Sequence, residues 1–257
     1  MEILLNGSTA SVCRPIKSKT PTKGEAMEKI RKTHSGKLLA CFFIVVSLSV
    51  SVLATVLFER RGFIVGAIAV TLGAIAALTV TSSRGLEGAR RSTLTAIMAA
   101  LAVVGRFIPI FKPVAAITIL SGAYLGAESG FLVGSVSALV SNIFFGHGPW
   151  TPFQMLGWGL IGYASGLLSH QLRRSLARRK VVLCIFGALC ALAYSLVMDV
   201  WSVLWYEPDF SLPLYLGVVT AAMPHTVIYL ISNVGFLLLL GRSFGKRLER
   251  IEKKYGI

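Results

Sequence analysis

Apolar residues in this chain fall into long blocks, unlike the short periodic segments of a soluble domain. Each block is close to the roughly 20 residues that a helix needs to cross a bilayer, although the third and fourth are short. The blocks cover residues 38–58, 62–82, 92–108, 113–127, 129–145, 152–168, 181–206 and 214–240. The pattern predicts an all-α fold, a polytopic bundle of eight transmembrane helices. The stretch from Arg106 to Pro113 either extends a neighbouring helix or forms a re-entrant loop.

The composition supports a membrane protein. Of the 257 residues, 54% are hydrophobic and only 14% are charged, whereas about a quarter of a soluble domain is charged. A soluble enzyme is therefore excluded. The four cysteines contain no CxxC pair, so neither a zinc site nor a disulfide framework is indicated, and we expect the cysteines to be packing residues.

The positive charges indicate the orientation of the chain. Lys and Arg total 26 against 11 acidic residues. Of these 26, 22 lie in alternate connections and at the two ends, and the remaining four are Arg60, Arg61, Arg106 and Lys112. Because cytoplasmic loops carry the Lys and Arg excess, the asymmetry predicts a multi-pass protein of the cell membrane with both termini in the cytoplasm. Nucleic-acid binding is not needed to explain the net charge of +15.

The same boundaries divide the chain into four parts. Residues 1–37 are expected to be a basic cytoplasmic tail without a fold, 38–82 two additional transmembrane helices, 91–240 a six-helix membrane domain and 241–257 a basic cytoplasmic end. The basic runs RRSLARRK at 173–180 and KRLERIEKK at 246–254 are expected to be helix ends that face lipid headgroups.

Groups for catalysis are sparse. The Gly36-Lys37 pair is followed by Leu38, so the chain has no P-loop and cannot hydrolyse ATP by that route. Paired carboxylates for metal or acid–base chemistry are lacking, and we expect no cofactor. One catalytic alternative stays open, an intramembrane serine protease of the rhomboid kind that uses Ser165 in GYASG and His225. The spacing from Gly162 to Ser165 differs from the rhomboid pattern, and small residues on membrane helices usually permit close packing.

Polar and aromatic side chains gather near one predicted face of the membrane. In SNIFFGHGPWTPFQMLGW at 141–158, Asn142 ends one helix, while Gln154 and Trp158 lie four apart on the next. Buried amides need a hydrogen-bond partner or a ligand, so the segment indicates a binding pocket. The alternative is that Trp150 belongs to an aromatic belt at the membrane interface and that the polar groups of the turn are paired with one another. Arg106 and Asp199 are expected to lie at matching depth in the membrane. They form a structural ion pair, contact the substrate, or do both. We hold His225, which follows Pro224, together with Tyr229 and Asn233 as weaker pocket candidates.

TAIMAALA at 95–102 places Ala96 and Ala100 on one helix face with Ala99 adjacent, a surface of small residues that permits close helix packing.

From about Arg91 to Leu240 the chain resembles the substrate-binding S components of energy-coupling factor (ECF) vitamin transporters. The stretch RFIPIFKPVAAITILSGAYLGAESGFLVGSVSALVSNIFFGHGPWTPFQMLGWGLIG at 106–162 is similar to the branch that includes cobalamin-type S components. The resemblance implies a subunit without catalytic activity that captures a vitamin-like nutrient from outside. It also implies ATP-driven uptake by partner subunits, namely a transmembrane coupling subunit and ATP-binding subunits.

The resemblance also implies roles for particular residues. Ala96 and Ala100 match the A-x-x-x-A face that meets the coupling subunit in this family, with Ala99 beside them. The vitamin pocket of the family opens outward among the later helices and their outer loops, where Asn142, Trp150 and Gln154 fall. The chain departs from the family pattern in having two extra predicted helices before the six.

Overall fold

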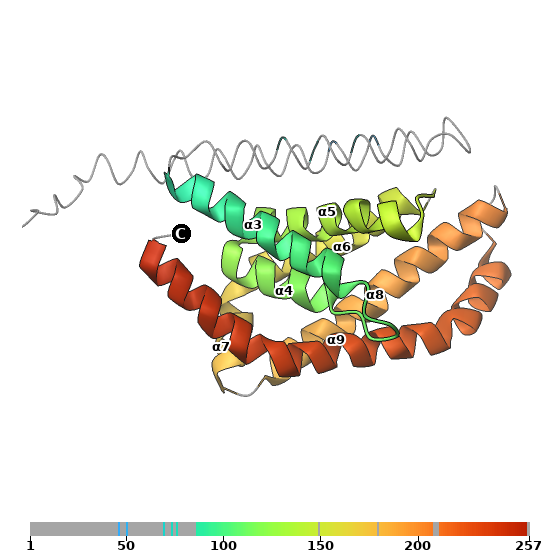
Figure 1. The fold of residues 1–257 in the computed structure, drawn as a ribbon. Coiled ribbons are helices and arrows are strands. Elements are labelled where there is room, and N and C mark those ends of the chain that lie inside the picture. The colour runs from blue at the N-terminus through green and yellow to red at the C-terminus, as the bar shows by residue number, and fades with distance from the viewer. Residues whose placement is uncertain are drawn as a thin grey trace, which may run out of the picture. The chain divides into compact units, whose positions relative to one another are not determined.

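The computed structural model describes residues 86–148, 150–178, 180–207 and 211–255, with isolated helical positions between 46 and 76. Helices and short connections make up the continuous described ranges (Figure 1). The helices are α3 (Leu86–Gly105), α4 (Val114–Leu125), α5 (Ala127–Phe145), α6 (Thr151–Leu167), α7 (Ser169–Arg178), α8 (Val181–Tyr206) and α9 (Leu212–Tyr255). The predicted all-α helical-bundle fold is confirmed. The predicted tail and the helices at 38–58 and 62–82 lie outside the described residues, apart from the isolated positions.

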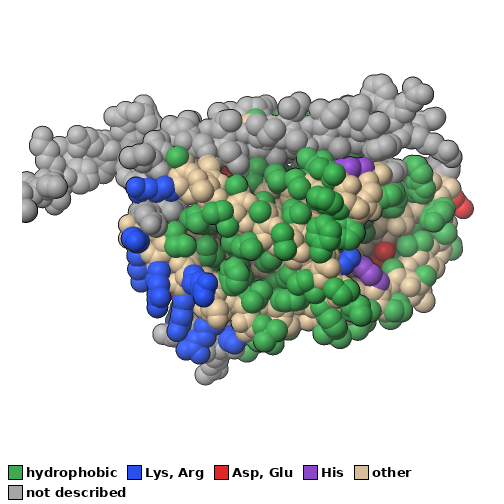
Figure 2. All heavy atoms as spheres, viewed as in Figure 1, with side chains coloured by type: hydrophobic (Ala, Val, Ile, Leu, Met, Phe, Trp, Pro, Cys, Tyr) green, Lys and Arg blue, Asp and Glu red, His purple; other side chains and the backbone are tan. Residues whose placement is uncertain are grey.

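Six of these helices cross the bundle in alternating directions, and the short α7 lies between α6 and α8. Figure 1 shows the start of α3 and the end of α9 at the same end of the bundle. We call this the basic end, because Lys and Arg gather there while hydrophobic side chains cover the middle of the molecule (Figure 2). The opposite end carries the connection from α3 to α4 and the start of α6.

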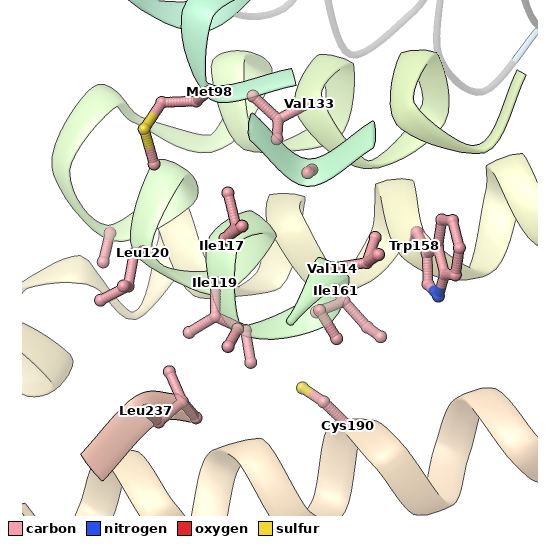
Figure 3. Close-up of a cluster of buried hydrophobic side chains, with 14 of the residues drawn as sticks. Met98, Val114, Ile117, Ile119, Leu120, Val133, Trp158, Ile161, Cys190 and Leu237 are labelled. Atoms are coloured by element: carbon pink, nitrogen blue, oxygen red, sulfur yellow. The ribbon is translucent and has the colours of Figure 1, made fainter. Parts of the chain in front are cut away.

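Helix α4 is the centre of the bundle. Its residues are apolar or small on every side, and all except Tyr124 are buried, as expected for a helix without a polar face. Its two buried hydroxyl side chains, Thr118 and Ser121, donate hydrogen bonds to backbone carbonyls one turn earlier, at 2.8 and 2.7 Å. Figure 3 shows Ile117, Ile119 and Leu120 of α4 within the hydrophobic core, with Trp158 at one edge.

Helices α5 and α6 pack against each other more extensively than any other described pair. Glycines make this possible: a methyl group on Gly130 or Gly134 of α5 would overlap the backbone of α6, and one on Gly162 would overlap Gly130. This spacing of small residues lets two membrane helices approach backbone to backbone. The turn between α4 and α5 is a single residue, Gly126, whose φ of 93° is unfavourable for a side chain.

Helices α5, α8 and α9 are each long and apolar enough to cross a membrane, and α4 is a shorter apolar helix. Helix α9 has 44 residues and therefore spans roughly 66 Å at 1.5 Å per residue, about twice the hydrocarbon thickness of a bilayer. It contains Pro224 and is curved along its length (Figure 1), as a proline that removes one helical hydrogen bond allows.

The predicted boundaries of the described helices agree with the structure to within a few residues, with three extensions. Helix α3 begins at Leu86, six residues before the predicted start at 92. Helix α9 continues through the basic segment after residue 240 as far as Tyr255, and the connection 169–180 contains α7. Both runs were expected to be helix ends, and the structure shows more helix than that. In α7 the reason is amphipathicity, since Leu172 is buried while His170, Gln171 and Arg174 are exposed. The connection 106–113 contains no helical residue, and Arg106 and Phe107 form a turn directly after α3.

Candidate functional site

A buried polar network begins at Arg106, directly after α3. Its Nη1 donates hydrogen bonds to Ser141 Oγ at 2.5 Å and to Asn142 Oδ1 at 2.6 Å, both in the last turns of α5. The guanidinium carbon also lies 5.2 Å from the centre of the Trp158 ring and 4.9 Å from that of Phe145. Arg106 is therefore held by hydrogen bonds and by cation–π contacts at once.

The network continues through two amides into the centre of the bundle. Asn142 Nδ2 donates to Thr151 Oγ1 at 3.0 Å and to Gln154 Oε1 at 2.9 Å. Gln154 Nε2 in turn donates to the phenol oxygen of Tyr194 on α8, at 3.1 Å. Asn142, Gln154 and Tyr194 are all buried, and a buried amide without a partner costs about 1–3 kcal/mol. These hydrogen bonds therefore join α5, α6 and α8, and the buried polar groups act as partners for one another.

Three aromatic rings from α6, α8 and α9 lie beside these amides. The rings of Trp158 and Tyr194 stack, with their centres 5.6 Å apart and an angle of 20° between their planes. Trp158 Nε1 donates to the phenol oxygen of Tyr229 at 3.0 Å, and the Tyr194 and Tyr229 rings are 5.2 Å apart. We call this set the amide–aromatic network. It consists of Arg106, Asn142, Gln154, Trp158, Tyr194 and Tyr229.

The connection between α3 and α4 lies over this part of the bundle. Phe107 contacts the rings of Phe144 and Phe145, and the Lys112 amine lies 5.5 Å from the centre of the Phe145 ring. Ser232 of α9 donates to the Lys112 carbonyl at 3.1 Å. Burial lowers the pKa of the Lys112 amine, and the neighbouring charge of Arg106 lowers it further. The connection therefore brings a second cation, Lys112, close to Arg106 of the network.

Asp199 of α8 and His225 of α9 lie close enough to interact electrostatically, but no hydrogen bond or ion pair joins these two described residues. Asp199 is buried. Arg106 and Asp199, both described, form no ion pair with each other. His225 is exposed, but its ring lies parallel to that of Tyr229 with centres 6.5 Å apart. The pair thus adjoins the network through Tyr229 without belonging to it.

Trp150 lies in a different aromatic group. Its ring meets that of Trp201 on α8 edge to face at 5.9 Å, and Trp201 also contacts Phe153 and stacks with Trp205. This cluster joins the start of α6 to the last turns of α8. Trp150 therefore fits the predicted aromatic belt more closely than the amide–aromatic network.

The structure adds residues that the sequence analysis missed, above all Tyr194. A tyrosine inside an apolar helix needs a hydrogen-bond partner for its hydroxyl group. This requirement could have identified Tyr194 as a candidate site residue. Ser141 and Thr151 were also missed. Tyr229, a weaker candidate, lies in the network, whereas Asn233 donates to the Gly187 carbonyl at 2.8 Å and its own Oδ1 has no partner.

The three alanines of α3 do not share one environment. Ala96 and Ala100 are exposed, while Ala99 is buried against the rest of the bundle. The side of α3 that carries Ala96 and Ala100 is therefore accessible, and Ala99 belongs to the core.

The two residues of the protease alternative have unrelated surroundings. Ser165 is fully buried, donates to the Gly162 carbonyl at 2.8 Å and packs against Gly122 of α4. His225 lies on α9 beside Tyr229 and interacts with Asp199. This geometry explains Ser165 as a packing residue and gives it no histidine as a base.

A comparison with known families decides the broad identity. Residues 89–243 match the family model described as the ECF-type riboflavin transporter, S component. The chain belongs to this S-component family. The match covers the whole segment from Arg91 to Leu240 on which the resemblance was based, and it confirms the resemblance. The family is one of transporter subunits rather than of enzymes. The cobalamin-type branch is untested and stays a prediction.

Curated relatives support the same assignment. The chain is 30% identical to a UPF0397 protein of Vibrio atlanticus over 177 residues, which cover 62% of this chain and 92% of the relative. It is also 30% identical to UPF0397 proteins from two strains of Aliivibrio fischeri over 169 residues, 59% of this chain and 88% of each relative. No solved structure matches.

Proposed function

We propose that this ECF S component captures a vitamin-like nutrient from outside the cell and delivers it to partner subunits for ATP-driven uptake. The observation that carries the proposal is the amide–aromatic network, which begins at Arg106, toward the end of the bundle opposite the basic end, and continues into the centre of the bundle. Positively charged connections favour the cytoplasmic side, so the network faces the side from which a nutrient arrives. Both chain termini are then cytoplasmic.

The chemistry of the network suits a flat, polar-edged ligand. Trp158, Tyr194 and Tyr229 offer stacking surfaces, the amides of Asn142 and Gln154 can both donate and accept hydrogen bonds, and Arg106 supplies a positive charge. These groups now satisfy one another, so a ligand would replace their mutual hydrogen bonds rather than meet unpaired groups. Riboflavin, which the description of the matching family names, has a flat ring with polar edges, and a cobalamin is the other candidate. Asp199 and His225 are proposed as contacts at the margin of the site, and Trp150 as one at its rim.

Direct titration tests the ligand site. The purified full chain in detergent is titrated with riboflavin, followed by quenching of ligand fluorescence, and with a cobalamin, followed by absorbance. We expect saturable binding of one of them, weakened roughly tenfold or more by Trp158→Ala, since a lost stacking contact together with a lost hydrogen bond costs about 1–3 kcal/mol. Trp205→Ala, which removes an exposed tryptophan of α8, is the matched control.

Trp158 is also part of the core, so a milder variant keeps the test informative. Trp158→Phe retains a ring but loses the donor to Tyr229, and its thermal melting shows whether the protein is folded. The site is wrongly placed if folded Trp158 variants bind as tightly as the Trp205→Ala control.

The partners we propose are a transmembrane coupling subunit and ATP-binding subunits. Ala96 and Ala100 are exposed on α3 and can accept a closely packed helix, and the sequence has no P-loop of its own. Replacing both alanines by Trp should abolish uptake and co-purification of the partners while ligand binding by the isolated chain persists. Val104→Trp, an equally bulky change at another exposed position of α3, is the control. Unchanged uptake in the double variant would exclude this face as the contact.

A further inference from the structure

A pocket of about 410 Å³ lies at the basic end of the bundle, and none of its lining residues belongs to the proposed ligand site. It is lined by Ser169, His170, Arg173 and Arg174, all from the first six residues of α7. The lining offers two guanidinium groups, an imidazole and a hydroxyl, and it has no carboxylate. Such a set of donors is suited to an anion with several acceptor oxygens.

Arg173 is held in position by its neighbours but keeps one donor unused. Its Nη2 pairs with Glu252 of α9, and its guanidinium carbon lies 4.5 Å from the centre of the Tyr124 ring of α4. Its Nε is buried and has no hydrogen-bond partner. An unpaired buried donor is costly, but this Nε is itself covered. An acceptor oxygen in the pocket would therefore meet the exposed part of the guanidinium, since a third of the Arg173 side chain is exposed.

The surroundings of α7 place the pocket at the surface of the bilayer. Leu167 and Leu168, just before α7, are exposed, and so are Val181 and Val182 at the start of α8. These apolar side chains face outward at the end of α6 and at the start of α8, and α8 is long and apolar enough to cross a membrane. Hydrocarbon is therefore expected to reach their level. Helix α7 itself buries Leu172 and exposes polar groups. Its pocket is therefore at headgroup depth, where an amphipathic helix lies along the interface.

We propose that this pocket binds a phosphate group, and that its position favours the phosphodiester of an anionic phospholipid over a soluble phosphate. The charge of Arg174, which is exposed, attracts the ligand, while Arg173 provides a preorganised donor. Acyl chains would lie against Leu167, Leu168, Val181 and Val182. The site is independent of nutrient binding and does not rest on the proposed function.

Binding of short-chain lipids to the full chain in a neutral detergent tests the proposal. The probes are dioctanoyl phosphatidylglycerol, dioctanoyl phosphatidylcholine and inorganic phosphate, and heat of binding is the measurement. We expect saturable binding of the phosphatidylglycerol about tenfold tighter than that of the phosphatidylcholine, weakened by added salt because charged groups carry it. Arg174→Gln and His170→Gln should each weaken it about fivefold or more.

The matched control is Arg242→Gln, which removes the same charge from an exposed position of α9 outside the pocket lining. Arg173→Gln is informative only with a melting curve, because Arg173 also joins α7 to α9. Displacement of phosphatidylglycerol by inorganic phosphate at similar concentration would identify a soluble phosphate as the source. Equal weakening by Arg242→Gln and Arg174→Gln, or no saturation by any phosphate probe, would overturn the proposal, because diffuse attraction would then explain the binding.

Discussion

The two halves of the helical bundle are held together by different means. Helices α3 to α6 pack around the buried α4, and α5 meets α6 through glycines that leave no room for a methyl group. Helices α8 and α9 contact each other through side chains, such as the hydrogen bond between Ser195 and Thr226 at 2.5 Å. In the most apolar stretch of α5, 67% of residues are buried, against 33% in α8 and 28% in α9.

The amide–aromatic network spans these two halves. Asn142, Gln154 and Trp158 belong to the first half, and Tyr194 and Tyr229 belong to the second. The contacts between them are single hydrogen bonds and ring contacts, whereas backbone meets backbone inside the first half. The proposed ligand site therefore lies where the packing of the bundle depends on side chains. The side chains of the site can vary without disturbing the glycine contacts between α5 and α6.

The largest expected effect comes from adding one methyl group to the tightly packed half. Gly162→Ala would place a Cβ against the backbone of Gly130, which cannot move without separating α5 from α6. We expect a loss of about 3 kcal/mol, the upper end of the usual cost of overpacking, or failure to fold. Thermal melting in detergent measures it. Gly217→Ala on α9, where nothing lies within 4 Å of the added Cβ, should melt near the wild-type temperature, and equal melting of the two variants would contradict the comparison.

An intermediate effect is expected where the halves meet. Gln154→Ala removes the hydrogen bonds to Asn142 and to Tyr194 and leaves their buried polar groups short of partners. The expected destabilisation is about 1–3 kcal/mol, together with weaker ligand binding. Gln171→Ala, at an exposed position of α7, serves as the control in the same melting and titration assays. A Gln154→Ala protein with unchanged stability and affinity would show that the network does not join the halves.

The smallest effect is expected within the second half. Asn233→Ala removes one hydrogen bond from α9 to the Gly187 carbonyl of α8 and also removes an oxygen that is buried without a partner. The lost bond contributes about 1 kcal/mol and the removal of the unpaired oxygen offsets part of it. The melting temperature should fall less than in Gln154→Ala, and a larger fall would mean that α8 and α9 depend on this contact more than the structure indicates.

Much of the fold followed from the sequence because long apolar blocks are a strong signal. The helix at 181–206 was predicted to the residue, and the convergence of Asn142, Gln154 and Trp158 followed from their spacing on two consecutive helices. The partners from distant helices could not be obtained in this way. The sequence around Tyr194 does not indicate which face of α8 packs against α6. The matching depth predicted for Arg106 and Asp199 did not indicate that Arg106 bonds to Asn142 while Asp199 lies near His225.

The glycine contacts illustrate a second limit. Gly130 and Gly134 are spaced for helix packing, but so are other small residues, and only the three-dimensional arrangement shows which of them lies against a backbone. Helix α7 was missed because its ten residues, rich in Arg and Ser, contain too few apolar side chains to form an apolar block, although the helix is amphipathic. Amphipathic helices of this length depend on tertiary contacts, here the burial of Leu172.

The shortness of α4 has a consequence for how the chain enters the membrane during synthesis. Its 12 residues span roughly 18 Å, less than the 30 Å or so of hydrocarbon, so a lone α4 would leave backbone groups at its ends without hydrogen-bond partners in lipid. Only Gly126 separates it from α5. Insertion of α4 and α5 together, as one hairpin, would let the apolar surface of α5 carry its shorter neighbour across the bilayer.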